Sequence, residues 1–157
     1  MRMEYDFIGS RGFRPQIVSS INPQYLISEL PHDWVEKLNA RLQELISLNV
    51  GWDGYQGQPV QYANAVFAQK IIERVCGNNN IMPSLVPGAS GDLQIEWHTL
   101  KGDIELDVLE PNSVRVYYSN DENSKEVEIV LTNDFTIVAG WLNEIKDTPI
   151  AIIAAAA

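Results

Sequence analysis

Residues 93–131 read LQIEWHTLKGDIELDVLEPNSVRVYYSNDENSKEVEIVL, and this stretch decides the fold. Apolar side chains recur at every second position in four short runs within it. The apolar positions are Leu93, Ile95 and Trp97; Ile104, Leu106 and Val108; Val114, Val116 and Tyr118; and Val127, Ile129 and Leu131. A period of two is typical of β-strands that bury one face and expose the other.

Turn-forming residues separate the four runs, at 101–103 (Lys-Gly-Asp), 110–112 (Glu-Pro-Asn) and 120–124. Gly, Pro, Asn and Asp favour turns because of their backbone freedom, fixed φ or local hydrogen bonding. Short turns join antiparallel strands, whereas parallel strands need long crossovers. The stretch therefore predicts a four-stranded antiparallel meander.

Helical spacing of apolar residues predicts two helices before the meander and one after it. The predicted ranges are 33–49, 59–75 and 133–146. Asp33 and Glu36 form a capping-box pattern for the first helix, and Pro59 suits the first position of the second. The expected buried faces are Trp34, Leu38, Leu42, Leu45 and Ile46; Ala63, Val66, Phe67, Ile71 and Val75; and Phe135, Val138, Trp141, Leu142 and Ile145.

The ends of the second and third helices also carry cap signals. Gly77 is expected to adopt the left-handed conformation of a C-terminal cap. Thr132 or Asn133 is expected to cap the third helix. This third helix should cover the apolar face of the meander.

The predicted fold is α+β, with residues 1–157 forming a single domain. The chain has 157 residues, which is about one domain at roughly 100–200 residues each. Residues 1–31 are expected to be irregular, with a short strand near 16–18. Residues 150–157 form an apolar tail, for which disorder, an added edge strand and an oligomer contact all remain open.

Acidic residues are concentrated after the first two predicted helices. Residues 91–157 carry four Lys or Arg and thirteen Asp or Glu, which gives −9 of the formal net charge of −10. Nucleic acids and anionic membranes are bound mainly through Lys and Arg, so direct binding to either is disfavoured. A basic protein partner is favoured, although acidity also serves solubility.

Other residue types point to a cytoplasmic protein without a cofactor. Cys76 is the sole cysteine, so no disulfide within the chain is expected. No stretch has the apolar run of a signal peptide or of a membrane span. The histidines, His32 and His98, have no metal-ligand spacing, and phosphate-binding and serine-hydrolase motifs are absent from the sequence.

The polar positions of the meander define its solvent face. They are Glu96, His98, Glu105, Asp107, Arg115, Tyr117, Glu126 and Glu128. In a meander, Arg115 and Tyr117 should lie between acidic neighbours on both sides. Three interpretations stay open: a solvated surface with weak ion pairs, a docking surface for a basic protein, and a catalytic or metal-binding carboxylate cluster.

An aromatic, glycine-rich loop is predicted between the first two helices, at residues 51–59 (GWDGYQGQP). Its glycines indicate unusual backbone angles. Either Trp52 packs between helices and sheet while Asp53 bonds loop amides, or Trp52, Asp53 and Tyr55 form a recognition site.

This loop resembles that of small, mostly uncharacterised bacterial proteins. They carry a (N/G)-W-D-G-Y-G-type loop before a Pro-rich link and a β-meander. The likeness covers roughly residues 40–110, carried by residues 51–57 and by residues 86–97, with Gln56 in place of a glycine. It implies a mobile-element or defence-type context and transfers no catalytic residue.

The sequence favours a non-catalytic interaction protein, similar in role to an antitoxin, an immunity protein or an inhibitor of a nucleic-acid enzyme. The partner-binding residues would be Trp52, Asp53, Tyr55, Glu96, Glu105, Asp107, Arg115, Tyr117, Glu126 and Glu128. One alternative is a metal-dependent hydrolase or nuclease that uses the sheet carboxylates. The other is a small-ligand sensor at the loop. Self-association stays open.

Overall fold

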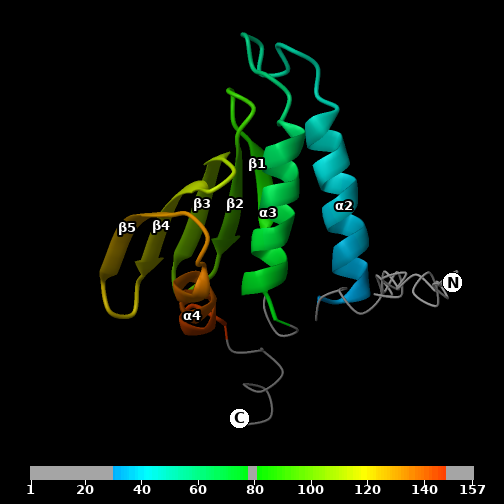
Figure 1. Cartoon of the computed structure of the whole chain (residues 1–157). Coiled ribbons are helices and arrows are strands. Elements are labelled where there is room, and N and C mark those ends of the chain that lie inside the picture. Colours follow the sequence, from blue (N-terminus) through cyan, green and yellow to red (C-terminus); the bar gives the residue numbers. More distant parts are fainter. Residues whose placement is uncertain (1–29, 78–80, 148–157) are drawn as a thin grey trace, which may run out of the picture.

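The computed structural model describes residues 30–77 and 81–147, which form an α+β fold. In these residues five strands make one antiparallel sheet, and three helices lie on one of its faces (Figure 1). The helices are α2 (His32–Ile46), α3 (Tyr62–Val75) and α4 (Thr136–Glu144). The strands are β1 (Ser84–Pro87), β2 (Leu93–His98), β3 (Asp103–Glu110), β4 (Ser113–Asn120) and β5 (Lys125–Leu131).

The sheet is a meander, with the strands side by side in chain order from β1 to β5. The four predicted strands are present as β2 to β5. The sequence pattern did not predict β1, a four-residue strand that ends in Pro87 and pairs with β2. A strand bounded by prolines gives no alternating signal, and proline is tolerated there because β1 lies at a sheet edge.

The apolar positions predicted for β2, β3 and β4 are all buried, so the period of two predicted the inner face correctly. On β5 the same positions are only partly buried. These residues are Val127, Ile129 and Leu131. The difference follows from helix placement, because the described helices approach β1, β2 and β3 most closely.

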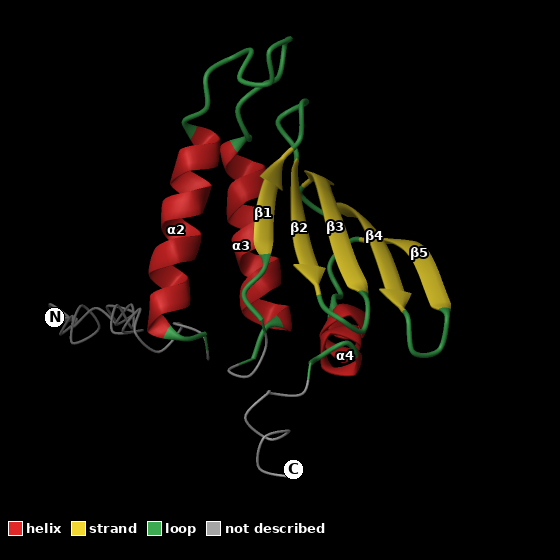
Figure 2. Ribbon diagram, turned by 180° about the vertical axis from the view of Figure 1, so that it is seen from behind, coloured by secondary structure: helices red, strands yellow, loops and turns green. Residues whose placement is uncertain are grey.

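The inner face is covered mainly by α3, which crosses β2 and β3, with α2 beside it along β1 (Figures 1 and 2). The expectation that the last helix covers the meander was therefore wrong in extent. Helix α4 closes one end of the face instead. There Trp141 stacks on Tyr118 at 4.5 Å, and the Tyr118 hydroxyl donates to Glu144 at 2.6 Å.

Several helix ends differ from the predicted caps. Pro31 occupies the cap position of α2, and Asp33 lies in the first turn without a capping hydrogen bond. Pro59 precedes α3, which begins at Tyr62. Gly77 does not adopt the left-handed conformation.

The face that α3 buries also differs from the predicted one. Ala63 is exposed, and the buried set is Asn64, Ala65, Ala68, Ile71, Ile72 and Val75. Asn64 is polar, so an apolar pattern does not predict its burial. Its amide nitrogen donates to the Gly91 carbonyl at 2.9 Å, which ties α3 to the β1–β2 link.

Helix α4 confirms its predicted apolar face, since Phe135, Val138, Trp141, Leu142 and Ile145 are all buried. Its cap prediction was wrong. Phe135 holds the cap position, and the carboxylate of Asp134 accepts hydrogen bonds from the backbone N–H and the hydroxyl of Thr136.

The two edges of the sheet have different surroundings. At the first edge, Arg41 of α2 donates two hydrogen bonds to the Leu85 carbonyl of β1, at 3.0 and 3.2 Å. At the second edge, no described helix or strand lies along the side of β5 that faces away from β4 (Figure 2).

Across the described ranges, none of the helices is long and apolar enough to span a bilayer. Two predictions concern residues outside the described ranges: the short strand near 16–18 and the roles left open for residues 150–157.

Candidate functional site

The outer face of the sheet, turned away from the helices, carries six carboxylates. We call it the acidic face; its residues are Glu96, His98, Asp103, Glu105, Asp107, Arg115, Tyr117, Glu126 and Glu128. Every sheet residue of the predicted partner-binding set lies on this face. Asp103 was missed because the sequence analysis assigned it to the turn before β3, whereas it is the first residue of that strand.

Like charges meet in the middle of the acidic face. Glu96 lies directly opposite Glu105, and Tyr117 lies between Glu105 and Glu128, as predicted. Opposed carboxylates on neighbouring strands cost stability. Gln94 relieves part of this cost by donating a hydrogen bond to Glu105 at 3.1 Å.

Arg115 compensates little of the negative charge. Its guanidinium lies 3.9 Å from the carboxylate of Asp107, at the long limit of an ion pair. Its neighbour on the other side is Val130, so the prediction of acidic neighbours on both sides was half wrong. Burial raises the pKa of Asp107, and the negative charges of Asp92 and Glu96 raise it further. The positive charge of Arg115 acts in the opposite direction.

His98 bridges two carboxylates at one end of the face. Its Nδ1 lies 2.8 Å from Asp103, and its Nε2 lies 3.2 Å from Glu96. A neutral imidazole has one N–H, so only the protonated ring donates to both carboxylates. These two hydrogen bonds raise the pKa of His98, and the bond to Asp103 contributes more than the bond to Glu96.

The alternative of a hydrolase concerns the sheet carboxylates together with Lys101, Cys76 and His98. Within residues 30–77 and 81–147, no three His, Cys, Asp or Glu side chains are grouped as metal ligands. Lys101 lies in the β2–β3 turn, where its ammonium is 3.4 Å from Glu122. Cys76 is buried in the core, while His98 lies on the outer face. Burial raises the pKa of the Cys76 thiol to about 12, which disfavours the nucleophilic thiolate.

The loop at residues 51–57 is held by its own hydrogen bonds. One oxygen of Asp53 accepts from the backbone N–H of Tyr55 and of Gly57, both at 2.9 Å, and these bonds lower the pKa of Asp53. The indole N–H of Trp52 donates to the Gln58 carbonyl at 2.9 Å. Gly51 has a φ of +83°, a conformation that favours glycine.

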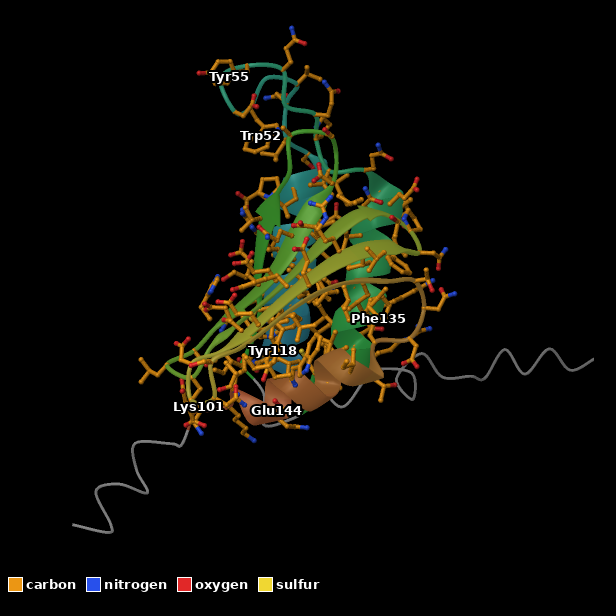
Figure 3. The ribbon with its side chains drawn as sticks, turned by 90° about the vertical axis from the view of Figure 1, so that its left-hand side faces the viewer. Trp52, Tyr55, Lys101, Tyr118, Phe135 and Glu144 are labelled. Carbon is orange, nitrogen blue, oxygen red and sulfur yellow. The ribbon has the colours of Figure 1, made fainter. Side chains whose placement is uncertain are left out.

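Trp52 does not pack between the helices and the sheet. It is partly exposed, and the loop stands beyond the ends of α2 and α3 with Tyr55 near its tip (Figure 3). The Tyr55 side chain is 88% exposed. The structure thus separates this aromatic loop from the acidic face, although the sequence analysis grouped them.

The chain matches no protein-family model, no curated protein and no solved structure. The likeness of its loop to bacterial WDGYG-type proteins therefore stays a prediction.

Proposed function

We propose that this chain is a non-catalytic interaction protein that docks its acidic face on a basic protein. The observation that carries the proposal is the acidic face itself, where six carboxylates lie with Arg115 and His98 on the side that the described helices leave uncovered. Plain solubility does not require like charges to be opposed, as in the pair Glu96 and Glu105. A basic partner would relieve that repulsion on binding.

A partner of this kind would present Lys and Arg side chains to the face. Complementary charge speeds encounter and selects against acidic competitors. If the partner is a nucleic-acid enzyme or toxin, the carboxylates would compete with phosphates for the same cations. The proposed role is accordingly that of an antitoxin, immunity protein or inhibitor in a bacterial or phage defence-type system.

The test neutralises the centre of the face in the triple variant Glu105→Gln, Asp107→Asn and Glu128→Gln. Wild type and variant would be immobilised and exposed to extract from cells that carry the native gene, and captured proteins would be quantified by mass spectrometry. We expect a basic protein to be captured by the wild type, lost with the triple variant and released by salt.

A matched control neutralises three exposed acids on the helices instead: Asp33→Asn, Glu44→Gln and Glu73→Gln. Both triple variants change the formal net charge from −10 to −7, so they lose the same charge from different surfaces. The control also removes the ion pair between Glu44 and Arg41. The control should capture the partner as the wild type does. Equal loss in both variants, or equal capture by both, would show that the acidic face does not select the partner.

The two alternatives, a metal-dependent hydrolase or nuclease and a small-ligand sensor at the loop, have less support from the described residues. The carboxylates of the acidic face lack a grouped set of metal ligands in the described residues. The aromatic loop exposes Tyr55 but uses the Asp53 carboxylate to hold its own backbone.

A further inference from the structure

We propose that β5 is the point of attachment, and that an extended basic segment of the partner adds to the sheet there as a sixth strand. This inference deepens the proposed function and rests on it. An edge strand presents unpaired backbone N–H and C=O groups, which an added strand can pair with. Strand β5 spans seven residues without proline or glycine, long enough to serve as a template.

The side chains of β5 form two rows, one on each face of the sheet, and both rows leave apolar surface exposed. On the inner side, Val127, Ile129 and Leu131 are only partly buried against the core. On the outer side, Val130 is 68% exposed at the end of the row that contains Arg115. One more strand would cover the inner row with its apolar side chains and would also shield Val130.

The charge of β5 determines which side chains the added strand should present on the acidic face. Glu126 and Glu128 point to the acidic face from β5, and both are exposed. Opposite charges facing each other across neighbouring strands are favourable, so Lys or Arg is preferred there. The expected occupant therefore alternates aliphatic residues with Lys or Arg over about seven positions, the length of β5.

A second copy of this chain fits the edge less well than a basic segment. Each copy has a formal net charge of −10, and pairing two β5 strands would continue one acidic face into another. Like charges brought together in this way oppose association.

The probe is a fluorescently labelled peptide, Lys-Val-Lys-Ile-Lys-Val-Lys, with blocked ends, titrated with the full chain at low ionic strength and followed by anisotropy. Two control peptides keep its charge. One has the same residues in an order without alternation, and the other carries N-methyl groups at alternate amides. We expect both controls to bind at least about tenfold more weakly, which is 1.4 kcal/mol.

Two protein variants locate the site. Val130→Lys places a positive charge on β5, and Val50→Lys makes the same change at a residue of the same type with almost equal exposure, 67% against 68%. Because both sites are exposed, both variants should fold. Val130→Lys should weaken binding of the alternating peptide by about tenfold or more, and Val50→Lys should change it by less than about twofold.

Binding of all three peptides with equal affinity, unaffected by Val130→Lys but lost in the acidic-face triple variant, would overturn strand addition and leave the proposed function standing. Failure of the alternating peptide to bind the wild type would also overturn it, as would a wild-type dimer that Val130→Lys dissociates. The capture experiment with the partner then decides the proposed function separately.

Discussion

The two edge strands of the sheet are opposites in how they meet solvent. Strand β1 is four residues long, ends in Pro87 and has its Leu85 carbonyl bonded by Arg41 of α2. Strand β5 is seven residues long, contains no proline and has no described element on its side away from β4. Short length, proline and covering elements are the usual protections against unwanted strand pairing. Among residues 30–77 and 81–147 these protections are found at the β1 edge and not at the β5 edge, which makes the open edge a candidate for recognition.

Truncation of one core side chain at each edge should show the largest difference. Leu85 of β1 is 4% exposed, so Leu85→Ala should lower the free energy of unfolding by about 2–4 kcal/mol. Ile129 of β5 is only partly buried, so Ile129→Ala should cost about 1 kcal/mol. Urea unfolding followed by tryptophan fluorescence measures both. Equal costs would mean that β5 is as well packed as β1.

Removal of the Arg41 guanidinium should open the closed edge. Arg41→Met keeps most of the aliphatic stem but leaves the Leu85 carbonyl without its two hydrogen bonds, at a cost of about 1–2 kcal/mol. Hydrogen exchange of the β1 amides should accelerate, whereas exchange in β5 should not change. Lys37→Met, on the same helix with an exposed ion pair to Asp33, is the control and should have little effect.

A pH titration tests the end of the acidic face where His98 lies, on β2 and not on either edge strand. The pKa of His98 is raised in the folded protein, so its stabilising contribution is fully present below its unfolded pKa and is lost as pH rises through the folded value. His98→Gln should therefore destabilise the protein at pH values below about 6.5 and approach the wild type at alkaline pH. The effect should stay under about 1 kcal/mol because the side chain is half exposed. A stability difference independent of pH would contradict a protonated bridge.

The smallest effect is expected at the open edge itself. Val130→Lys should lower the free energy of unfolding by only about 0.5 kcal/mol, because Val130 is exposed and the added ammonium meets only the like charge of Arg115 on the neighbouring strand. Thermal unfolding of this variant beside Val50→Lys measures the difference. A large loss would show that the outer row of β5 is structural and not a free surface.

The sequence predicts the faces of the sheet well because alternation reports directly which side of a strand is apolar. Alternation does not report whether a helix covers the apolar side of a strand. The apolar side chains of β5 were therefore expected to be as buried as those of β3, and only the placement of the helices distinguishes the two strands. Strand β1 escaped notice because four residues ending in proline have no measurable period.

The candidate site was predicted in part for similar reasons. Alternation along each strand predicts which acidic residues share one face. The hydrogen bond between His98 and Asp103 depends on the first residue of β3, and nothing in the local sequence indicates whether the strand begins at Asp103 or one residue later. The position of Trp52 depends on the path of a loop between two helices. Its indole bonds to a loop carbonyl, a contact that apolar patterning does not predict.

The order of the strands has a consequence for how the chain acquires its structure. Each strand pairs with its neighbour in sequence, so the sheet needs only short loops to close and should zip up hairpin by hairpin at a comparatively fast rate. Strand β5 joins this sheet last during synthesis from the N-terminus. The strand with the open edge is therefore made only after β1 to β4, and β4 is then available to pair with its other side.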